Sequence, residues 1–135
     1  MTDPARTLTV TAVWGGGYRC EVAARQHRIQ VDEPVSVQGT DTGSTPTELF
    51  LASLGSCFAL ALHHVAAKRG LEILSLQISV TGTYSGPSFG DLGLDIAIEA
   101  NTDDAVIADL IDRAKAVCYI SNTLDHPPPV AVRRV

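Results

Sequence analysis

The stretch that decides the fold is TPTELFLASLGSCFALALHHVAAKRG, residues 45–70. Thr45 can serve as the N-cap of a helix, the proline after it suits the first helical position, and Glu48 can complete a capping box. Gly70 can close the helix in the left-handed conformation, after two basic residues that suit the negative end of the helix dipole. We therefore expect a helix over residues 46–69, about 36 Å long at ~1.5 Å per residue.

The first two-thirds of this helix is apolar or small on every side, so every side requires cover. A chain of 135 residues, of which only 19% are charged, can hardly provide that cover alone. These two observations predict an oligomer. The apolar run of residues 49–62 is interrupted by Ser53, Gly55 and Ser56 and falls short of the ~18–20 residues that span a bilayer, so no membrane association is expected.

The residues before this helix alternate as strands do. Leu8, Val10 and Ala12 predict a first strand, and the glycines at 15–17 provide a turn into a second strand over residues 18–22. A third strand with Ile29 and Val31 would complete an antiparallel meander, followed by a loop over residues 32–45 that is rich in Gly, Thr, Ser, Pro and Asp.

The residues after the helix predict a hairpin, a second helix and a closing strand. The hairpin pairs residues 74–80 with 92–98, and Asn101–Asp104 caps the second helix. That helix carries an apolar stripe made of Ile107, Ile111, Ala114 and Cys118. The prolines at 127–129 break the chain before a short strand over 130–135. The expected order is β-β-β-α-β-β-α-β in a single α+β domain over residues 1–135.

Charge and motifs exclude several functions. The net charge of −5 argues against nucleic acid as a partner, and Gly39–Gly43 lacks the lysine of a phosphate-binding loop. His63 and His64 are adjacent on a helix and point about 100° apart, so they do not form a metal site, and we expect no metal and no bound cofactor. No basic or apolar leader precedes Pro4, so we expect a cytoplasmic protein.

The three cysteines remain as candidates for chemistry. Cys57 lies on the long helix and Cys118 on the apolar stripe of the second helix, so both thiols can face one core. Each is either a small buried hydrophobe or a reactive thiol, and the sequence alone leaves both readings open. Cys20 lies on a strand between Tyr18 and Val22, and we expect it to be part of the core.

These motifs resemble the OsmC/Ohr family, which contains osmotically inducible and organic hydroperoxide resistance proteins. The resemblance rests on Asp32–Pro34, the Gly-rich loop, residues 45–49, Leu54–Cys57 and Cys118–Asn122, and it covers nearly the whole chain in order. It implies an OsmC-like fold and an intertwined homodimer, in which two long central helices pack back to back within sheets from both chains.

The family's peroxidase members reduce organic hydroperoxides with two thiols. By resemblance, Cys57 is the peroxidatic cysteine that becomes a sulfenic acid, and Cys118 is the resolving cysteine that forms a disulfide with it. An external dithiol reductant would reopen this disulfide. An arginine from the partner chain holds the thiolate in these proteins; Arg19 is the nearest match, and Arg25 and Arg28 stay open as alternatives.

The chain departs from the peroxidase pattern at the acid that pairs with this arginine. Peroxidase members carry a glutamate directly after the proline, where this chain has Thr47; the acid here is Glu48, one position later. One residue rotates a helical side chain by about 100°, so Glu48 either replaces that acid or only caps the helix. The surrounding pattern is similar to the broader OsmC-like branch. Two rival hypotheses stay open: a non-catalytic protein that binds an apolar small molecule at the dimer groove, and a purely structural dimer module.

Overall fold

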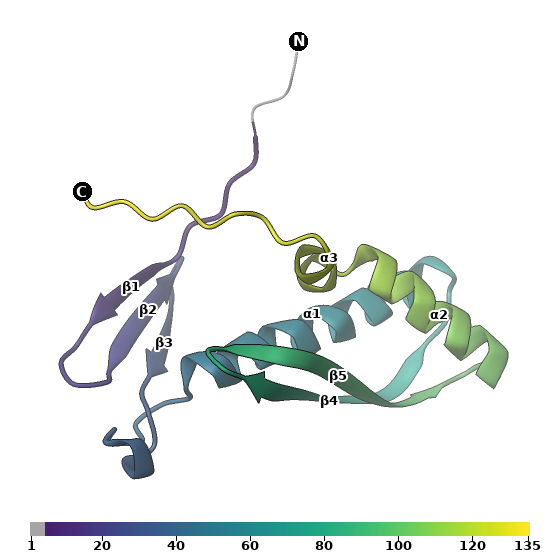
Figure 1. Cartoon of the computed structure of the whole chain (residues 1–135). Helices are drawn as coiled ribbons and strands as arrows, with labels where there is room; N and C mark the ends of the chain where they lie inside the picture. Colours follow the sequence, from purple (N-terminus) through teal and green to yellow (C-terminus); the bar gives the residue numbers. More distant parts are fainter. Residues whose placement is uncertain (1–4) are drawn as a thin grey trace. The chain divides into compact units, whose positions relative to one another are not determined.

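The computed structural model describes residues 5–135 and divides into two compact units, one extending to Leu49 and the other comprising Phe50–Val135 (Figure 1). Residues 1–4, for which the sequence predicted no leader, lie outside the described part. The expected single domain over residues 1–135 remains a prediction.

The first unit contains a three-stranded antiparallel sheet. Its strands β1 (Thr11–Trp14), β2 (Cys20–Ala24) and β3 (His27–Val31) pair in sequence order, which confirms the meander. Gly16 and Gly17 have positive φ in the β1–β2 turn, as the sequence predicted. The prediction that β1 includes Leu8 and Val10 is wrong, because neither residue has a strand partner and pairing begins at Thr11.

The loop after β3 is organised around the buried carboxylate of Asp32. Its Oδ1 accepts hydrogen bonds from the backbone N–H of Glu33 at 2.8 Å and of Thr40 at 3.4 Å, and Oδ2 accepts from the hydroxyls of Thr40 and Thr42. The hydrogen bond from the Thr40 hydroxyl has the largest effect on the pKa of Asp32. Together with the other hydrogen bonds it holds this pKa far below its ordinary range, although burial acts in the opposite direction. A one-turn 3-10 helix, η1 (Val35–Val37), lies within this loop.

The loop leads into α1 (Pro46–Lys68), and the capping box that the sequence predicted is present. The backbone N–H of Thr45 donates to Oε1 of Glu48 at 2.8 Å, and the N–H of Glu48 donates to Oγ1 of Thr45 at 3.1 Å. At the other end, Gly70 has a φ of +66°, and the N–H of Leu71 bonds the carbonyl of Ala66 at 3.0 Å. This is a Schellman motif, so both ends of the predicted helix are confirmed to within one residue.

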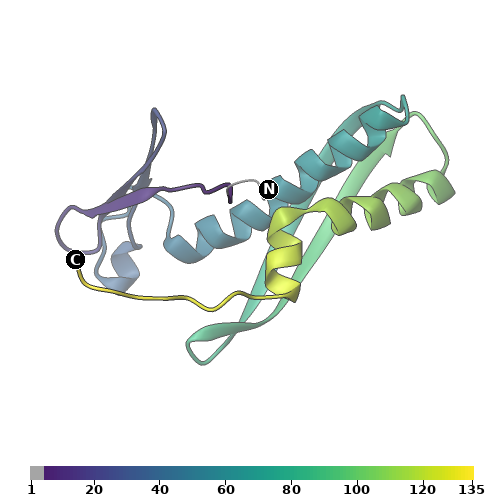
Figure 2. The same ribbon diagram turned by 90° about the horizontal axis from the view of Figure 1, so that it is seen from above.

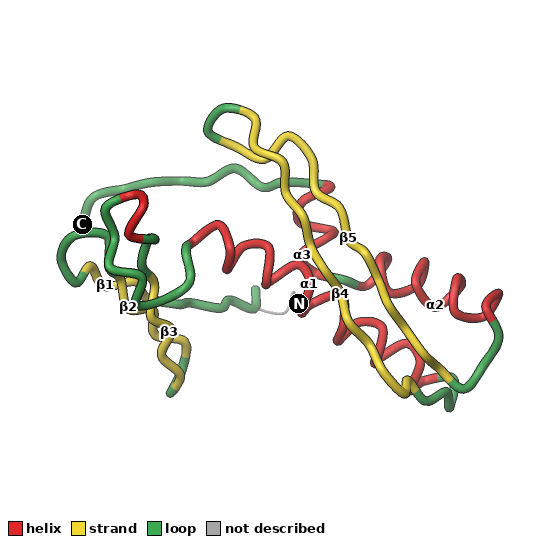
Figure 3. Tube along the Cα trace, turned by 90° about the horizontal axis from the view of Figure 1, so that it is seen from below, coloured by secondary structure: helices red, strands yellow, loops and turns green. Residues whose placement is uncertain are grey.

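The second unit packs α1, from Phe50 onward, between a long hairpin and two further helices. The hairpin consists of β4 (Ile73–Ser85) and β5 (Ser88–Ala100), and the helices are α2 (Asp104–Val117) and α3 (Tyr119–Asp125). Figures 2 and 3 show α2 running beside α1 while the two strands cross the helices. A Cβ on Gly55 of α1 would lie 2.9 Å from a methyl carbon of Val80, so glycine allows α1 to approach β4 closely.

The core of this unit differs in part from the predicted stripe. Leu110 and Ala114 of α2 are fully buried against Leu62 of α1, whereas Ile107 and Ile111 are only partly buried. Cys118 is buried as expected, but α2 ends at Val117, so Cys118 lies at the junction of α2 and α3. The prediction missed α3 because the sequence offers no regular N-cap there.

The predicted closing strand over residues 130–135 does not form in the structure. The described chain after α3 has no regular structure, and Val130, Val132 and Val135 are exposed. The alternation of valines that suggested a strand therefore has no partner strand to pair with in the described chain.

The expectation that no segment is long enough to cross a membrane also needs correction. Helix α1 has 23 residues, and the mean hydropathy of its most apolar stretch is 1.7, which is high enough for a membrane span. The Ser and Gly residues within this stretch do not lower the mean hydropathy below that level. Length and composition alone are equally typical of a core helix, and α1 contributes Phe58, Leu62 and Val65 to the core described above.

The Asp32 network predicts a specific loss of stability in acid. Folding lowers the pKa of Asp32 from its ordinary value of 3.8. The ionised carboxylate therefore contributes fully to the free energy of unfolding at pH values above 3.8, and this contribution declines as the pH falls below 3.8. We expect Asp32→Asn to lower the melting temperature by several degrees at pH 7, and to make the variant less sensitive than the wild type to acid below pH 4. Thermal unfolding followed by circular dichroism at both pH values measures this. Equal losses of stability in acid for both proteins would contradict it.

Candidate functional site

Two thiols from different elements of the second unit belong to one core. Cys118, at the junction of α2 and α3, is a member of the buried core, and Cys57 of α1 packs against that core, near enough to affect the pKa of Cys118. Both are free cysteines. The expectation that these two thiols face one core is therefore confirmed. Cys57 reaches this core from within a helix, whereas Cys118 reaches it from the junction of two helices.

The two thiols differ in their surroundings. Cys118 is fully buried, and this desolvation raises its pKa, with a smaller contribution in the same direction from the Cys57 side chain. The backbone N–H groups of Ser121 and Ile120 act against this shift. Cys57 is only partly buried. Cys118 is thus held as a neutral thiol out of contact with solvent, and Cys57 is the thiol that an incoming molecule can reach.

Cys57 opens onto a cavity of about 450 Å³ on one side of α1. Leu60 and Ala61 follow Cys57 along this face of the helix, and Val117 and Tyr119 enter from the residues that flank Cys118. His64, two turns after Cys57, also lines the cavity. Most of the lining is apolar, so the cavity suits an organic molecule whose reactive group lies at the Cys57 sulfur.

The expected supporting residues lie in the first unit. Arg19 is exposed in the β1–β2 turn and lines a separate hollow of about 370 Å³ with Trp14 and Cys20. Arg28 pairs with Glu21 at 3.4 Å, and Arg25 has a positive φ and donates to Gln26. These arginines and Cys57 belong to different units, and the assignment of Arg19 remains a prediction.

Glu48 completes the capping box with both its carboxylate and its backbone N–H. The backbone and side chain of Thr45 lower its pKa, which matches a carboxylate committed to the helix N-terminus. Capping therefore accounts for Glu48 in this chain, and a role beside the thiol remains a prediction.

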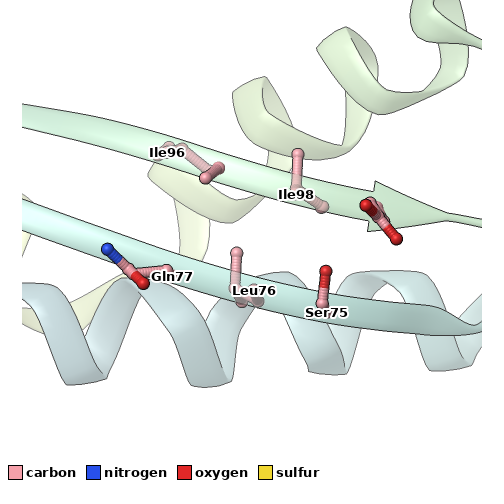
Figure 4. Close-up of a pocket in the computed structure, with 7 residues that line it drawn as sticks. Ser75, Leu76, Gln77, Ile96 and Ile98 are labelled. Atoms are coloured by element: carbon pink, nitrogen blue, oxygen red, sulfur yellow. The ribbon is translucent and has the colours of Figure 1, made fainter.

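Other features of the described chain carry no comparable chemistry. A hollow of about 630 Å³ lies over β4 and β5, where Ser75, Leu76 and Gln77 adjoin Ile96 and Ile98 (Figure 4). It has no thiol or imidazole in its lining. Within residues 5–135, no group of three or more His, Cys, Asp or Glu side chains could hold a metal ion. Cys20 is partly buried at the start of β2 rather than in a core.

The site thus combines two neighbouring thiols of an α+β protein, one buried and one beside an apolar cavity. Residues 39–133 match the family model described as OsmC-like protein, and the chain belongs to this family. The match covers nearly all of the second unit and residues 39–49 of the first.

Individual relatives agree with this assignment. The chain is 33% identical over 75 residues to organic hydroperoxide resistance protein OhrB from Bacillus subtilis, an alignment that covers 56% of this chain and about half (51%) of that protein. An OsmC-like protein from Mycoplasma pneumoniae has the same fold, with a TM-score of 0.82 and 22% identity over 90% of this chain and 89% of that one. An organic hydroperoxide resistance protein from Elizabethkingia anophelis matches with a TM-score of 0.61 and 23% identity, over 93% of each chain.

Both thiols were predicted from the sequence, whereas the other residues that line the cavity were not. His64 was considered only as a metal ligand together with His63, and Leu60, Val117 and Tyr119 were not considered. The spacing of seven residues between Cys57 and His64, which places both on one helix face, is the signal that could have identified the imidazole.

Proposed function

We propose that this protein is a thiol peroxidase that reduces organic hydroperoxides through a two-cysteine cycle, in the cytoplasm, where thiols are kept reduced. The observation that carries the proposal is the proximity of the partly buried Cys57 and the fully buried Cys118 in one core beside an apolar cavity. Two relatives are organic hydroperoxide resistance proteins, which supports the choice of substrate.

In the first step, the Cys57 thiolate attacks the terminal oxygen of the hydroperoxide. The O–O bond breaks, sulfur is oxidised to a sulfenic acid, and the organic part leaves as an alcohol after taking up a proton. In the second step, the Cys118 sulfur attacks the Cys57 sulfur, water leaves, and a disulfide forms. An external dithiol then reduces the disulfide. The cycle converts one hydroperoxide and two external thiols into an alcohol, water and an oxidised dithiol.

The difference in burial between the thiols supports their order of action. Only Cys57 adjoins the cavity, so the hydroperoxide meets it first. Cys118 is shielded from peroxide by its burial and lies near the sulfur that it must attack. A buried, neutral thiol is a poor nucleophile toward the substrate, which protects Cys118 from oxidation until the sulfenic acid has formed next to it.

A second candidate function is the binding of an apolar small molecule without turnover. A further cavity of about 360 Å³ favours it, because Leu54, Phe58 and Leu94 line it with other, mainly apolar side chains and neither Cys57 nor Cys118 does. Such a protein would bind its ligand equally well when Cys57 is replaced.

We also propose that the working unit is a homodimer. In α1, Ala52, Ser56 and Leu60 form an exposed ridge of small and apolar side chains, with Leu60 69% exposed. Among the described residues of the first unit, Val31 is the only buried apolar side chain, so three short strands have too little core to be stable alone. A second copy that covers the ridge and the sheet would supply the missing contacts.

The two-thiol cycle predicts different behaviour for two serine variants. With cumene hydroperoxide and dithiothreitol, Cys57→Ser should lose essentially all turnover, because no sulfenic acid forms. In a parallel assay without dithiothreitol, which would itself reduce a sulfenic acid, Cys118→Ser should reduce about one equivalent of peroxide per chain and keep a sulfenic acid that excess peroxide over-oxidises, whereas the wild type should form a disulfide. The measurement is peroxide consumption together with the intact mass of each protein.

Cys20→Ser is the matched control for these variants, since Cys20 lies in the other unit and should be dispensable. Full turnover by Cys57→Ser would refute the peroxidase proposal. Negligible turnover by the wild type, together with unchanged ligand binding in Cys57→Ser, would favour the second candidate function.

The dimer predicts that a bulky charge on the ridge separates the chains. Ala52→Arg would bury an unpaired guanidinium in the contact between two α1 helices, and we expect its apparent mass to fall from two chains to one. Size-exclusion chromatography with light scattering measures this, with Lys68→Arg as a control that keeps the charge of an exposed residue. A wild-type protein that elutes as a single chain would contradict the dimer.

A further inference from the structure

The cavity of about 360 Å³ that contains neither thiol lies on the side of α1 opposite the exposed ridge. Leu54 and Phe58 of α1 line it, and both are nearly fully buried. Each lies two positions after a ridge residue, Ala52 or Ser56, which is about 200° around the helix. A second copy packed on the ridge would therefore not cover this side of α1, and the volume of the cavity suits a small ligand.

The polar residues of this cavity include one cation and one anion. Lys115 of α2 and Asp125 of α3 both line it and are exposed, and neither forms an ion pair with another described residue. The rest of the lining is apolar apart from Ser121. An organic acid would meet the like charge of Asp125, and an amine that of Lys115, whereas a hydroxyl group can donate to the carboxylate and accept from the ammonium. The lining therefore favours an uncharged amphiphile with a hydroxyl head group.

The side of the cavity formed by α3 is directly connected to the thiol pair. Helix α3 contributes Ser121, Leu124 and Asp125 to the lining, and it begins at the residue after Cys118. It has seven residues, and none of them is buried. Because a helix this short is not stable by itself, its position depends on the fully buried Cys118 that precedes it.

We propose that this cavity is a regulatory site for an uncharged amphiphile, such as a medium-chain alcohol, and that a bound ligand opposes disulfide formation between Cys57 and Cys118. The second part rests on the proposed two-cysteine cycle. A disulfide requires the sulfurs to come closer than two thiols do, so Cys118 moves toward α1 and α3 moves with it. Because Leu54 and Phe58 lie within one turn of Cys57, this movement narrows the cavity between α3 and α1. By linkage, the disulfide weakens ligand binding as much as the ligand disfavours the disulfide.

Ligands that differ only in head group test the chemistry of the site without any peroxide. Binding of 1-octanol, octanoate and octylammonium to the reduced wild-type protein is measured by isothermal titration calorimetry. We expect octanol to bind about three- to tenfold more tightly than either charged ligand, an effect of roughly one net hydrogen bond. No binding of octanol, equal binding of all three ligands, or tighter binding of a charged ligand would overturn the inference.

The two exposed residues Lys115 and Asp125 provide variants that locate the ligand. Asp125→Asn should raise the affinity for octanoate about three- to tenfold, because it removes a like charge, and Lys115→Met should do the same for octylammonium. The matched control is Asp112→Asn, at an exposed position of α2 outside the lining, and it should bind each ligand as the wild type does. Equal effects of Asp112→Asn and Asp125→Asn would overturn the inference.

The coupling is tested by comparing reduced protein with protein in which diamide has linked Cys57 to Cys118. Diamide takes up the two electrons and two protons of the thiols, so this step needs no peroxidase activity. Octanol should bind the linked form about fivefold or more weakly, within the usual range for coupled sites. Cys57→Ser treated with diamide is the control and should keep the affinity of the reduced wild type. Equal affinity of the two forms, or failure of diamide to link the cysteines, would overturn the coupling.

Peroxide consumption separates this inference from the proposed function. Protein that loses affinity for octanol on linkage by diamide but does not consume cumene hydroperoxide would refute the peroxidase function and leave the regulatory site intact. Protein that turns over cumene hydroperoxide through the disulfide but binds octanol equally in both forms would overturn the regulatory site alone.

Discussion

The proximity of the Cys57 and Cys118 thiols depends on the packing of α1 against α2 and the residues that follow it. Leu62 of α1 and Leu110 of α2 are both fully buried in this core, to which Cys118 also belongs. Gly55 allows β4 to approach α1 closely. The position of each thiol is thus fixed by a tightly packed part of the chain.

The same packing separates the roles of the two sulfurs. Burial keeps Cys118 neutral and out of reach, while the partly buried Cys57 borders an apolar cavity that extends along α1 to His64. Leu60 lines this cavity and also belongs to the exposed ridge of α1, so a second chain that covered the ridge would lie beside the cavity.

Local signals allowed most of the fold to be predicted from the sequence. The capping box at Thr45, the glycine after α1 and the β4–β5 alternation each reflect hydrogen bonding or burial within a few residues, and all were found in the structure. The strand expected over residues 130–135 and the missed helix α3 depend on contacts with distant parts of the chain, which alternation of residues does not encode. Likewise, both thiols were predicted from their positions, whereas the cavity required the approach of Val117 and Tyr119 to α1.

The most direct test of the account is to locate the disulfide that forms after reduced protein reacts with one equivalent of cumene hydroperoxide. Peptide mapping by mass spectrometry under non-reducing conditions identifies the linked residues. The account predicts a bond between Cys57 and Cys118 within one chain, with Cys20 still reduced, because the first two thiols belong to one core and Cys20 lies in the other unit. A bond that includes Cys20, or oxidised Cys57 that stays unlinked while Cys118 keeps its free thiol, would contradict it.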